Sequence, residues 1–171
     1  MINAGNIEQA VSVLQRIPRE SADPLLQTRL QQLRAQILIH EEQPEKALAL
    51  LTVNDTLPVT VRAFTHELRA RAYLLSGNYL ESARERIVLE PLLLNAEKID
   101  LNREQIWESL RQLSPIFLQQ MTMEPAPDIL SGWMNLVKIS KTLTDSTEAF
   151  AASIAQWKAS YPQHPATGKI L

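Results

Sequence analysis

Cysteine is absent from these 171 residues, so the chain forms no disulfide and offers no thiolate to a metal or a substrate. It also lacks the serine-x-x-lysine and glycine-x-serine-x-glycine patterns of common nucleophile sites, and any glycine-rich phosphate loop. The three histidines, His40, His66 and His164, have no second ligand at metal-site spacing. We therefore expect no catalytic, cofactor-binding or metal-binding residues and no enzymatic activity.

A concentration of charge of one sign is missing too. Up to Glu90 there are ten Lys and Arg against eleven Asp and Glu, and after it seven against eight. Nucleic-acid binding needs a concentrated basic face to neutralise phosphates, so we expect no nucleic-acid partner. Apolar runs such as Leu92-Leu93-Leu94 are far shorter than the roughly 18 to 20 residues that cross a bilayer.

Glycine is scarce, with four residues, and no segment alternates apolar and polar side chains as a strand would. Apolar residues instead recur every three or four positions, which predicts an all-α fold. In the first half the stripes are Leu26, Leu30, Leu33 and Ile37, then Leu48 and Leu51, then Val61, Phe64, Leu68, Ala72 and Leu75. Asp23 and Pro24 predict the start of the first of these helices, and Gly77 predicts the end of the third.

The second half is predicted to be helical as well. A helix from about Tyr79 should end at Pro91, and a short one should follow Ser114-Pro115. The other stripes are Ile99, Ile106, Trp107 and Leu110, then Ile129, Trp133, Leu136, Val137 and Leu143, then Phe150, Ile154, Trp157 and Tyr161. Asp145 and Glu148 predict a capping box for the last helix. The three tryptophans fit these apolar stripes, so we expect them in the core.

A turn followed by an alanine that opens an apolar helix face occurs three times. The three alanines, Ala10, Ala47 and Ala83, lie 37 and 36 residues apart, an interval typical of stacked antiparallel helix hairpins. The first signature starts at Gly5, midway through a hairpin, so we expect the chain to be a fragment of a longer protein. We predict a single all-helical domain over 1–171, with clearer hairpin repeats over 1–95, an irregular half over 96–171 and a hinge at 121–128.

Two resemblances follow from particular residues. Gly77-Asn78-Tyr79, preceded by Ala70 and Tyr73, resembles a tetratricopeptide repeat, which implies a tetratricopeptide-like solenoid. The phrases Ile129-Leu130-Ser131-Gly132-Trp133-Met134-Asn135-Leu136 and Trp157-Lys158-Ala159-Ser160-Tyr161-Pro162-Gln163-His164-Pro165 are similar to the amino-terminal domain of the LpoA lipoproteins. Glu90-Pro91-Leu92-Leu93, ahead of Trp107, is similar as well.

The second resemblance implies a location, a partner and a role. LpoA lipoproteins lie on the periplasmic side of the bacterial outer membrane and activate a class A penicillin-binding protein, a peptidoglycan synthase. It implies that the membrane is reached only through a lipid anchor absent from this chain. The function it implies is that of a non-catalytic interaction and spacer domain.

One polar stripe is a candidate binding surface. The stripe consists of four residues at i, i+4, i+7 and i+11, namely Arg62, His66, Arg69 and Tyr73. It lies about 160° around the helix from the apolar residues Phe64 and Leu68. Two guanidinium groups beside an aromatic ring suit a carboxylate, so the alternative function is a groove that binds peptidoglycan or an anionic peptide. These residues can equally be solvent-facing or paired with acids such as Glu67 and Glu81.

Overall fold

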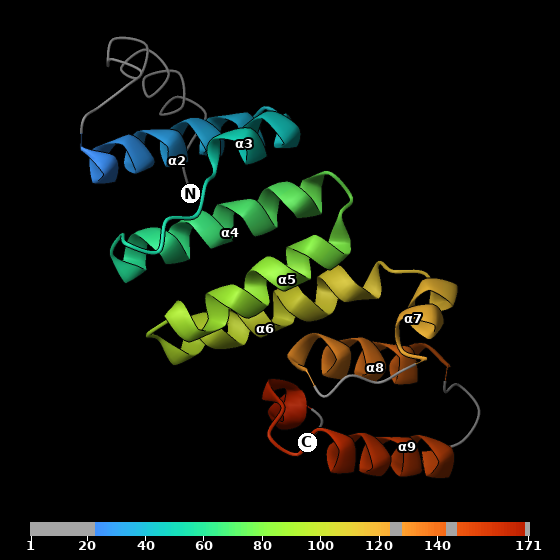
Figure 1. The fold of residues 1–171 in the computed structure, drawn as a ribbon. Helices are drawn as coiled ribbons and strands as arrows, with labels where there is room; N and C mark the ends of the chain where they lie inside the picture. The colour runs from blue at the N-terminus through green and yellow to red at the C-terminus, as the bar shows by residue number, and fades with distance from the viewer. Residues whose placement is uncertain (1–22, 124–127, 143–146, 170–171) are drawn as a thin grey trace. The chain divides into compact units, whose positions relative to one another are not determined.

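A computed structural model describes residues 23–123, 128–142 and 147–169. Across these ranges the ordered elements are helices, and they form antiparallel hairpins (Figure 1). The predicted all-α hairpin fold is therefore confirmed. The chain divides into two compact units, Met1–Asn78 and Tyr79–Leu171. None of the described helices is long and apolar enough to cross a membrane.

The first unit contains three described helices, α2 (Pro24–His40), α3 (Pro44–Leu50) and α4 (Val59–Leu75), each of which contacts the other two. The predicted start of α2 is confirmed, because Asp23 Oδ1 accepts a hydrogen bond from the Leu25 amide and Pro24 is the first helical residue. Gly77 follows α4 with φ +75°, a backbone conformation that glycine adopts without strain. The predicted end of α4 is confirmed as well.

The first unit packs around small residues. Its buried cluster consists of Ala35, Ala47, Leu51, Leu68 and Ala72. A buried glutamine adds a polar link, since Gln32 Nε2 donates to Val61 O at 2.8 Å and to Thr65 Oγ1 at 2.9 Å. Alanine side chains are small, so they let packed helices approach closely. The Gln32 hydrogen bonds add to this packing as a second link between α2 and α4.

The stripe predicted for α2 is wrong in part. Leu30 is buried, but Leu26 is 49% exposed and Leu33 44% exposed. Gln32 and Ala35 take inward positions instead. The spacing of the leucines predicts the helix correctly but not its buried face. On that face lie the hydrogen-bonded side-chain amide of Gln32 and the methyl group of Ala35.

The second unit contains α5 (Tyr79–Leu89), the 3-10 turn η1 (Glu90–Leu92), α6 (Ala96–Arg111), α7 (Pro115–Met121), α8 (Ile129–Thr142), α9 (Thr147–Ser160) and the 3-10 turn η2 (Pro165–Lys169). Proline 91 stops α5 as predicted, and Ser114 caps α7 through its hydroxyl oxygen. The core is one cluster that includes Ile106, Leu110, Trp133, Val137 and Trp157. Every helix of this unit from α5 to α9 packs directly against a neighbour within it.

Two polar pairs join α5 to α6. The hydroxyls of Ser82 and Ser109 lie 3.3 Å apart, and Arg86 and Asn102 exchange two hydrogen bonds. In that exchange Asn102 Nδ2 donates to the Arg86 carbonyl at 2.9 Å, and Arg86 Nη1 donates to Asn102 Oδ1 at 3.5 Å. All four residues are buried, so these contacts fix which residues of the two helices lie opposite one another.

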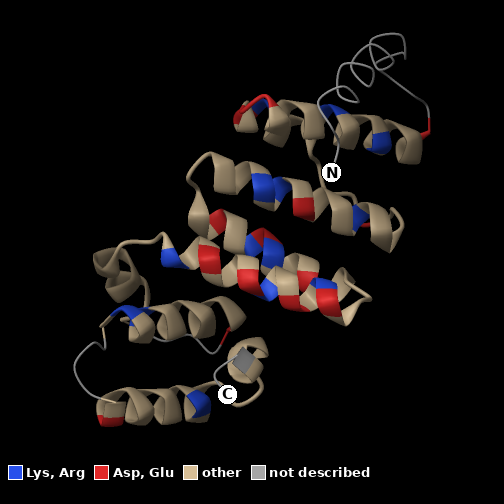
Figure 2. Ribbon diagram, turned by 180° about the vertical axis from the view of Figure 1, so that it is seen from behind, with Lys and Arg blue, Asp and Glu red and all other residues tan. Residues whose placement is uncertain are grey.

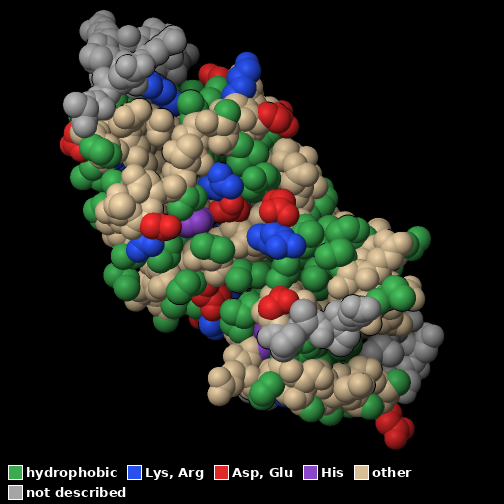
Figure 3. All heavy atoms as spheres, viewed as in Figure 1, with side chains coloured by type: hydrophobic (Ala, Val, Ile, Leu, Met, Phe, Trp, Pro, Cys, Tyr) green, Lys and Arg blue, Asp and Glu red, His purple; other side chains and the backbone are tan. Residues whose placement is uncertain are grey.

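Charges of both signs alternate along α5 and α6, while α8 and α9 carry few (Figure 2). The face seen in Figure 3 likewise mixes apolar, basic and acidic side chains. Several predicted features lie outside the described residues: the first repeat signature at Gly5, Leu143, the Asp145 cap, and residues 124–127 of the hinge over 121–128. The domain boundaries and the hinge remain predictions.

Candidate functional site

The polar stripe predicted on α4 begins with an ion pair. Arg62 Nη1 lies 3.5 Å from Asp55 Oδ1, and the Asp55 side chain is 88% exposed. Arg62 therefore pairs with a neighbouring acid, as the alternative interpretation of the stripe expected, and that acid is Asp55. Because an ion pair with so exposed a carboxylate contributes little, Asp55 adds little to what holds the Arg62 side chain, which is itself only 24% exposed.

The remaining stripe residues have different environments. His66 is buried, with 8% of its surface exposed, so it is not part of an exposed face. Arg69 Nη1 donates to the Leu51 carbonyl at 2.9 Å, and Nη2 lies 3.4 Å from the Tyr73 hydroxyl. The guanidinium carbon is 5.6 Å from the centre of the Tyr73 ring, a cation–π distance. Arg69 and Tyr73 thus form a stacked pair that also ties α4 to the end of α3.

The carboxylates of this chain are dispersed. Within the described ranges no group of three or more His, Cys, Asp or Glu side chains gathers at metal-binding distance. Glu108 pairs with Arg111 at 3.2 Å, and Glu90 pairs with Arg103 at 2.7 Å. Glu81, proposed from the sequence as a partner of the α4 stripe, pairs with Arg84 at 3.3 Å.

The two tryptophan-centred phrases of the sequence meet in the second unit. Trp133 and Trp157 are buried, with 0% and 3% of their surfaces exposed, as predicted. The His164 ring lies between them, 5.3 Å from Trp133 and 5.1 Å from Trp157 in centroid distance. Tyr161 completes the cluster at 5.9 Å from His164. We call Trp133, Trp157, Tyr161 and His164 the aromatic cluster.

Hydrogen bonds fix this cluster to α8. Trp157 Nε1 donates to the Gly132 carbonyl at 2.8 Å. The Ala166 amide donates to His164 Nδ1 at 3.1 Å, so the ring proton is on Nε2, which donates to the Ile129 carbonyl at 2.8 Å. Burial lowers the pKa of His164 below its usual 6.5, against the opposing effect of the Ile129 hydrogen bond. The imidazole is therefore a neutral structural bridge between α8 and η2.

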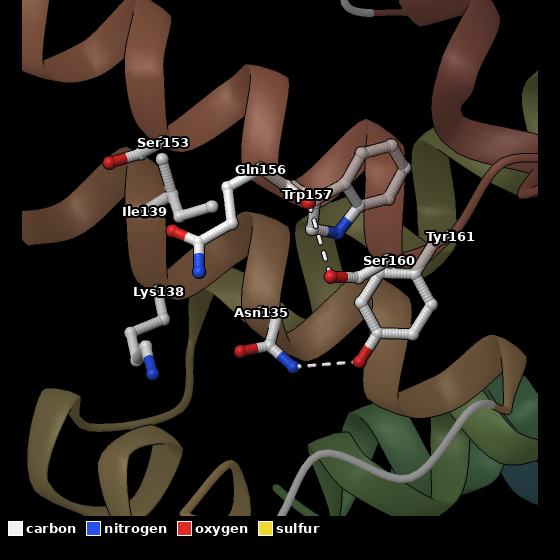
Figure 4. A pocket seen from close by; sticks show the side chains of 8 residues that line it. All are labelled: Asn135, Lys138, Ile139, Ser153, Gln156, Trp157, Ser160 and Tyr161. Atoms are coloured by element: carbon white, nitrogen blue, oxygen red, sulfur yellow. Dashed lines mark hydrogen bonds between the residues drawn. The ribbon is translucent and has the colours of Figure 1, made fainter.

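Beside the cluster, α8 and α9 line an open pocket of about 250 Å³. Its lining residues are Asn135, Lys138, Ile139, Ser153, Gln156, Trp157, Ser160 and Tyr161. The carboxamides of Asn135 and Gln156 turn toward the same space, and the Asn135 nitrogen is joined to the Tyr161 hydroxyl at 3.1 Å (Figure 4). We call this cavity the α8–α9 pocket.

Comparison with known proteins places the chain in a family. A model of the LppC lipoprotein family matches residues 1–170. The chain belongs to this family. A relative in Vibrio cholerae, named penicillin-binding protein activator LpoA, is 32% identical over 167 residues, which are 96% of this chain and 28% of that protein. The LpoA of Aliivibrio fischeri is 29% identical over 163 residues, 94% of this chain and 27% of that protein.

Solved structures agree on the fold of this LppC family member. Full-length LpoA from Haemophilus influenzae matches with a TM-score of 0.79 at 19% identity, covering 96% of this chain and 30% of that one. The amino-terminal domain of LpoA from E. coli matches with a TM-score of 0.74 at 24% identity, covering 95% of this chain and 72% of that one. The chain spans less than a third of the length of the curated relatives that it matches.

Sequence reasoning missed two features of this LppC family member. It treated His164 as one scattered histidine, although the ring joins both phrases that carry the family resemblance. It also gave no sign of the α8–α9 pocket. The polar lining is spaced at i, i+3 on α8 and i, i+3, i+7 on α9, a signal that shows only once the two helices are known to pack together.

Proposed function

We propose that this chain is a non-catalytic interaction and spacer domain of a lipoprotein on the periplasmic side of the outer membrane. In this proposal it supports activation of a class A penicillin-binding protein, a peptidoglycan synthase. The observation that carries the proposal is the 32% identity, over 96% of the chain, to a protein named as an activator of a penicillin-binding protein.

The structure supports an interaction role in two ways. Stacked hairpins present rows of side chains over an extended surface, which suits contact with another protein. The ion pairs seen among the described residues, such as Arg62 with Asp55 and Glu90 with Arg103, lie apart from one another along the chain. Catalysis instead requires titratable groups that converge on one reacting atom.

The proposal is tested by measuring glycan polymerisation by a class A penicillin-binding protein with three additions: this chain, the rest of the lipoprotein, and both joined as one protein. We expect the joined protein to activate more than the rest alone. A direct binding measurement with this chain distinguishes a contact from a spacer effect. Equal activation with and without the helical part, together with no binding, would refute the proposal.

A second candidate function is recognition of an anionic peptide or glycan carboxylate by Arg62, Arg69 and Tyr73, without His66. It is favoured by the stacking of Arg69 on Tyr73 and by the exposed, weakly held Asp55, which an incoming carboxylate can displace from Arg62.

Co-sedimentation with peptidoglycan sacculi tests this second function. The variant Arg62→Ala/Arg69→Ala should pellet less than the wild type. The control Lys46→Ala/Arg71→Ala removes two exposed cations from α3 and α4 outside the stripe, so it should pellet normally. Equal pelleting of all three proteins would refute a role for the stripe.

A further inference from the structure

We propose that the α8–α9 pocket is a binding site for a small N-acyl amino acid, or for the carboxyl end of a peptide that bears an acyl-amide group. Such a ligand offers a carboxylate, an amide N–H and an amide carbonyl close together. The site lies within the second unit and is independent of the activation role proposed above.

The pocket carries one positive charge and no opposing acid. Lys138 lines it, and the described lining contains no Asp or Glu. Lys138 Nζ donates to Thr122 Oγ1 at 2.9 Å, while that hydroxyl donates to the Leu118 carbonyl at 2.7 Å. One of the three ammonium donors is therefore used to hold the side chain, and the others suit a carboxylate.

The side-chain amides of Asn135 and Gln156 offer an acceptor and a donor that suit an amide group of the ligand. Asn135 Nδ2 donates to the Ser131 carbonyl at 3.0 Å and to the Tyr161 hydroxyl at 3.1 Å. These bonds use both amide hydrogens and leave Oδ1 as an acceptor for a ligand N–H. Gln156 faces the same space from α9 (Figure 4), and its amide nitrogen suits a ligand carbonyl.

Apolar groups complete the lining. Ile139 and the edge of the Trp157 ring line the same pocket, where they can cover a methyl group or another small side chain. The Trp157 ring does not move freely, because its indole nitrogen is bonded to Gly132 and the ring makes a T-shaped contact with His164. This wall of the site is thus preorganised, which reduces the ordering cost of binding.

The volume indicates how large a group the pocket can cover. About 250 Å³ corresponds to the space of roughly eight water molecules. N-acetylalanine has a similar number of non-hydrogen atoms, so it is the probe that we choose. A ligand of this size binds with a dissociation constant on the order of millimolar.

The experiment is an NMR titration of the whole 171-residue chain with N-acetylalanine and, in parallel, with N-acetylalaninamide. The amide differs from the acid only in lacking the carboxylate charge. We expect the acid to shift the side-chain amide signals of Asn135 and Gln156 and the indole signal of Trp157, and to bind about tenfold more tightly than the amide. No shifts up to ~50 mM acid, or equal binding of the two compounds, would overturn the proposal.

Variants separate a specific site from general attraction of anions. Lys138→Gln retains a donor for Thr122 but loses the charge, and should weaken binding of the acid about tenfold. Lys158→Gln, which removes the same charge from α9 outside the lining, should leave binding unchanged. Equal weakening by both variants would overturn the proposal.

If Lys138→Gln does not fold, Gln156→Ala provides a second test, because Gln156 lines the pocket but remains exposed, so its truncation should leave the fold intact. This variant should weaken binding of both probes by about threefold, since it removes the partner of the ligand carbonyl. Unchanged binding to Gln156→Ala would overturn the assignment of the amide contact.

Discussion

Replacing Gly132 by alanine should destabilise the second unit, although the same change stabilises an ordinary helix. Gly132 lies in α8, where alanine is favoured over glycine by about 1 kcal/mol. A methyl group placed on Gly132 would lie 2.5 Å from His164 Nε2, still closer to Cδ2, and 3.2 Å from Tyr161 Cδ1. The imidazole cannot swing away without breaking its bonds to Ile129 and Ala166.

The expected loss follows from these contacts. Overpacking a core costs about 1 to 3 kcal/mol, and leaving buried polar groups unpaired costs about 1 to 3 kcal/mol more. After subtracting the gain in helix propensity, we expect the free energy of unfolding to fall by about 3 kcal/mol. For a unit of this size, that lowers the urea midpoint by about 1 to 3 M.

Tryptophan fluorescence is the appropriate assay, because Trp107, Trp133 and Trp157 all belong to the second unit. The control is Gly168→Ala, since a methyl group there would meet no atom within 4 Å. The double variant Gly132→Ala/His164→Ala should lose less stability than the sum of the two single variants, as alanine at 164 removes the clash. A Gly132→Ala protein as stable as the wild type, or strict additivity in the double variant, would refute the reasoning.

Three further predictions concern buried hydrogen bonds. His164 stays neutral in the fold because its pKa is lowered, whereas the unfolded chain takes up a proton below pH 6.5. The free energy of unfolding should therefore decline as pH falls through 6.5, by up to about 1.4 kcal/mol per pH unit. In urea titrations at pH 7.5 and 5.5, His164→Gln should flatten this slope. Trp157→Phe should cost about 1 to 3 kcal/mol, because it removes the buried indole hydrogen bond to the Gly132 carbonyl and part of a core side chain. Thermal unfolding measures this loss, and a loss under about 0.5 kcal/mol would contradict the prediction. Gln32→Leu should destabilise the first unit by about 0.5 to 1.5 kcal/mol for each of the two hydrogen bonds lost to α4, since the Val61 carbonyl keeps the Thr65 hydroxyl as a donor. Hydrogen exchange of α4 amides should rise, and unchanged protection there would argue against the Gln32 link.

Local signals in the sequence predict the helices of this chain well. Asp23, Pro24, Pro91, Ser114 and Gly77 each act on the backbone within a few residues, so their effects can be recognised without knowing the fold. The burial of Trp133 and Trp157 was predicted for a related reason, since each lies on a strong apolar stripe.

Features that depend on distant partners were not predicted. The inward position of Gln32 depends on acceptors 29 and 33 residues away, and the role of His164 depends on a carbonyl 35 residues away. The α4 stripe shows the same limit. Helical spacing placed its residues on one helix correctly, but the pairing of Arg62 with Asp55 and the burial of His66 required knowledge of the surrounding chain.

The paired contacts between α5 and α6 bear on how such repeats evolve. A recurring hairpin suggests that the repeats are interchangeable and that any one of them can be exchanged, duplicated or deleted. Here the Ser82 and Ser109 hydroxyls and the exchange between Arg86 and Asn102 tie one helix to one particular partner. A transplanted helix that lacked the matching amide would leave a buried guanidinium without that contact. Recombination within this family should therefore preserve α5 and α6 as an inseparable pair, and boundaries of successful chimeras should fall outside it.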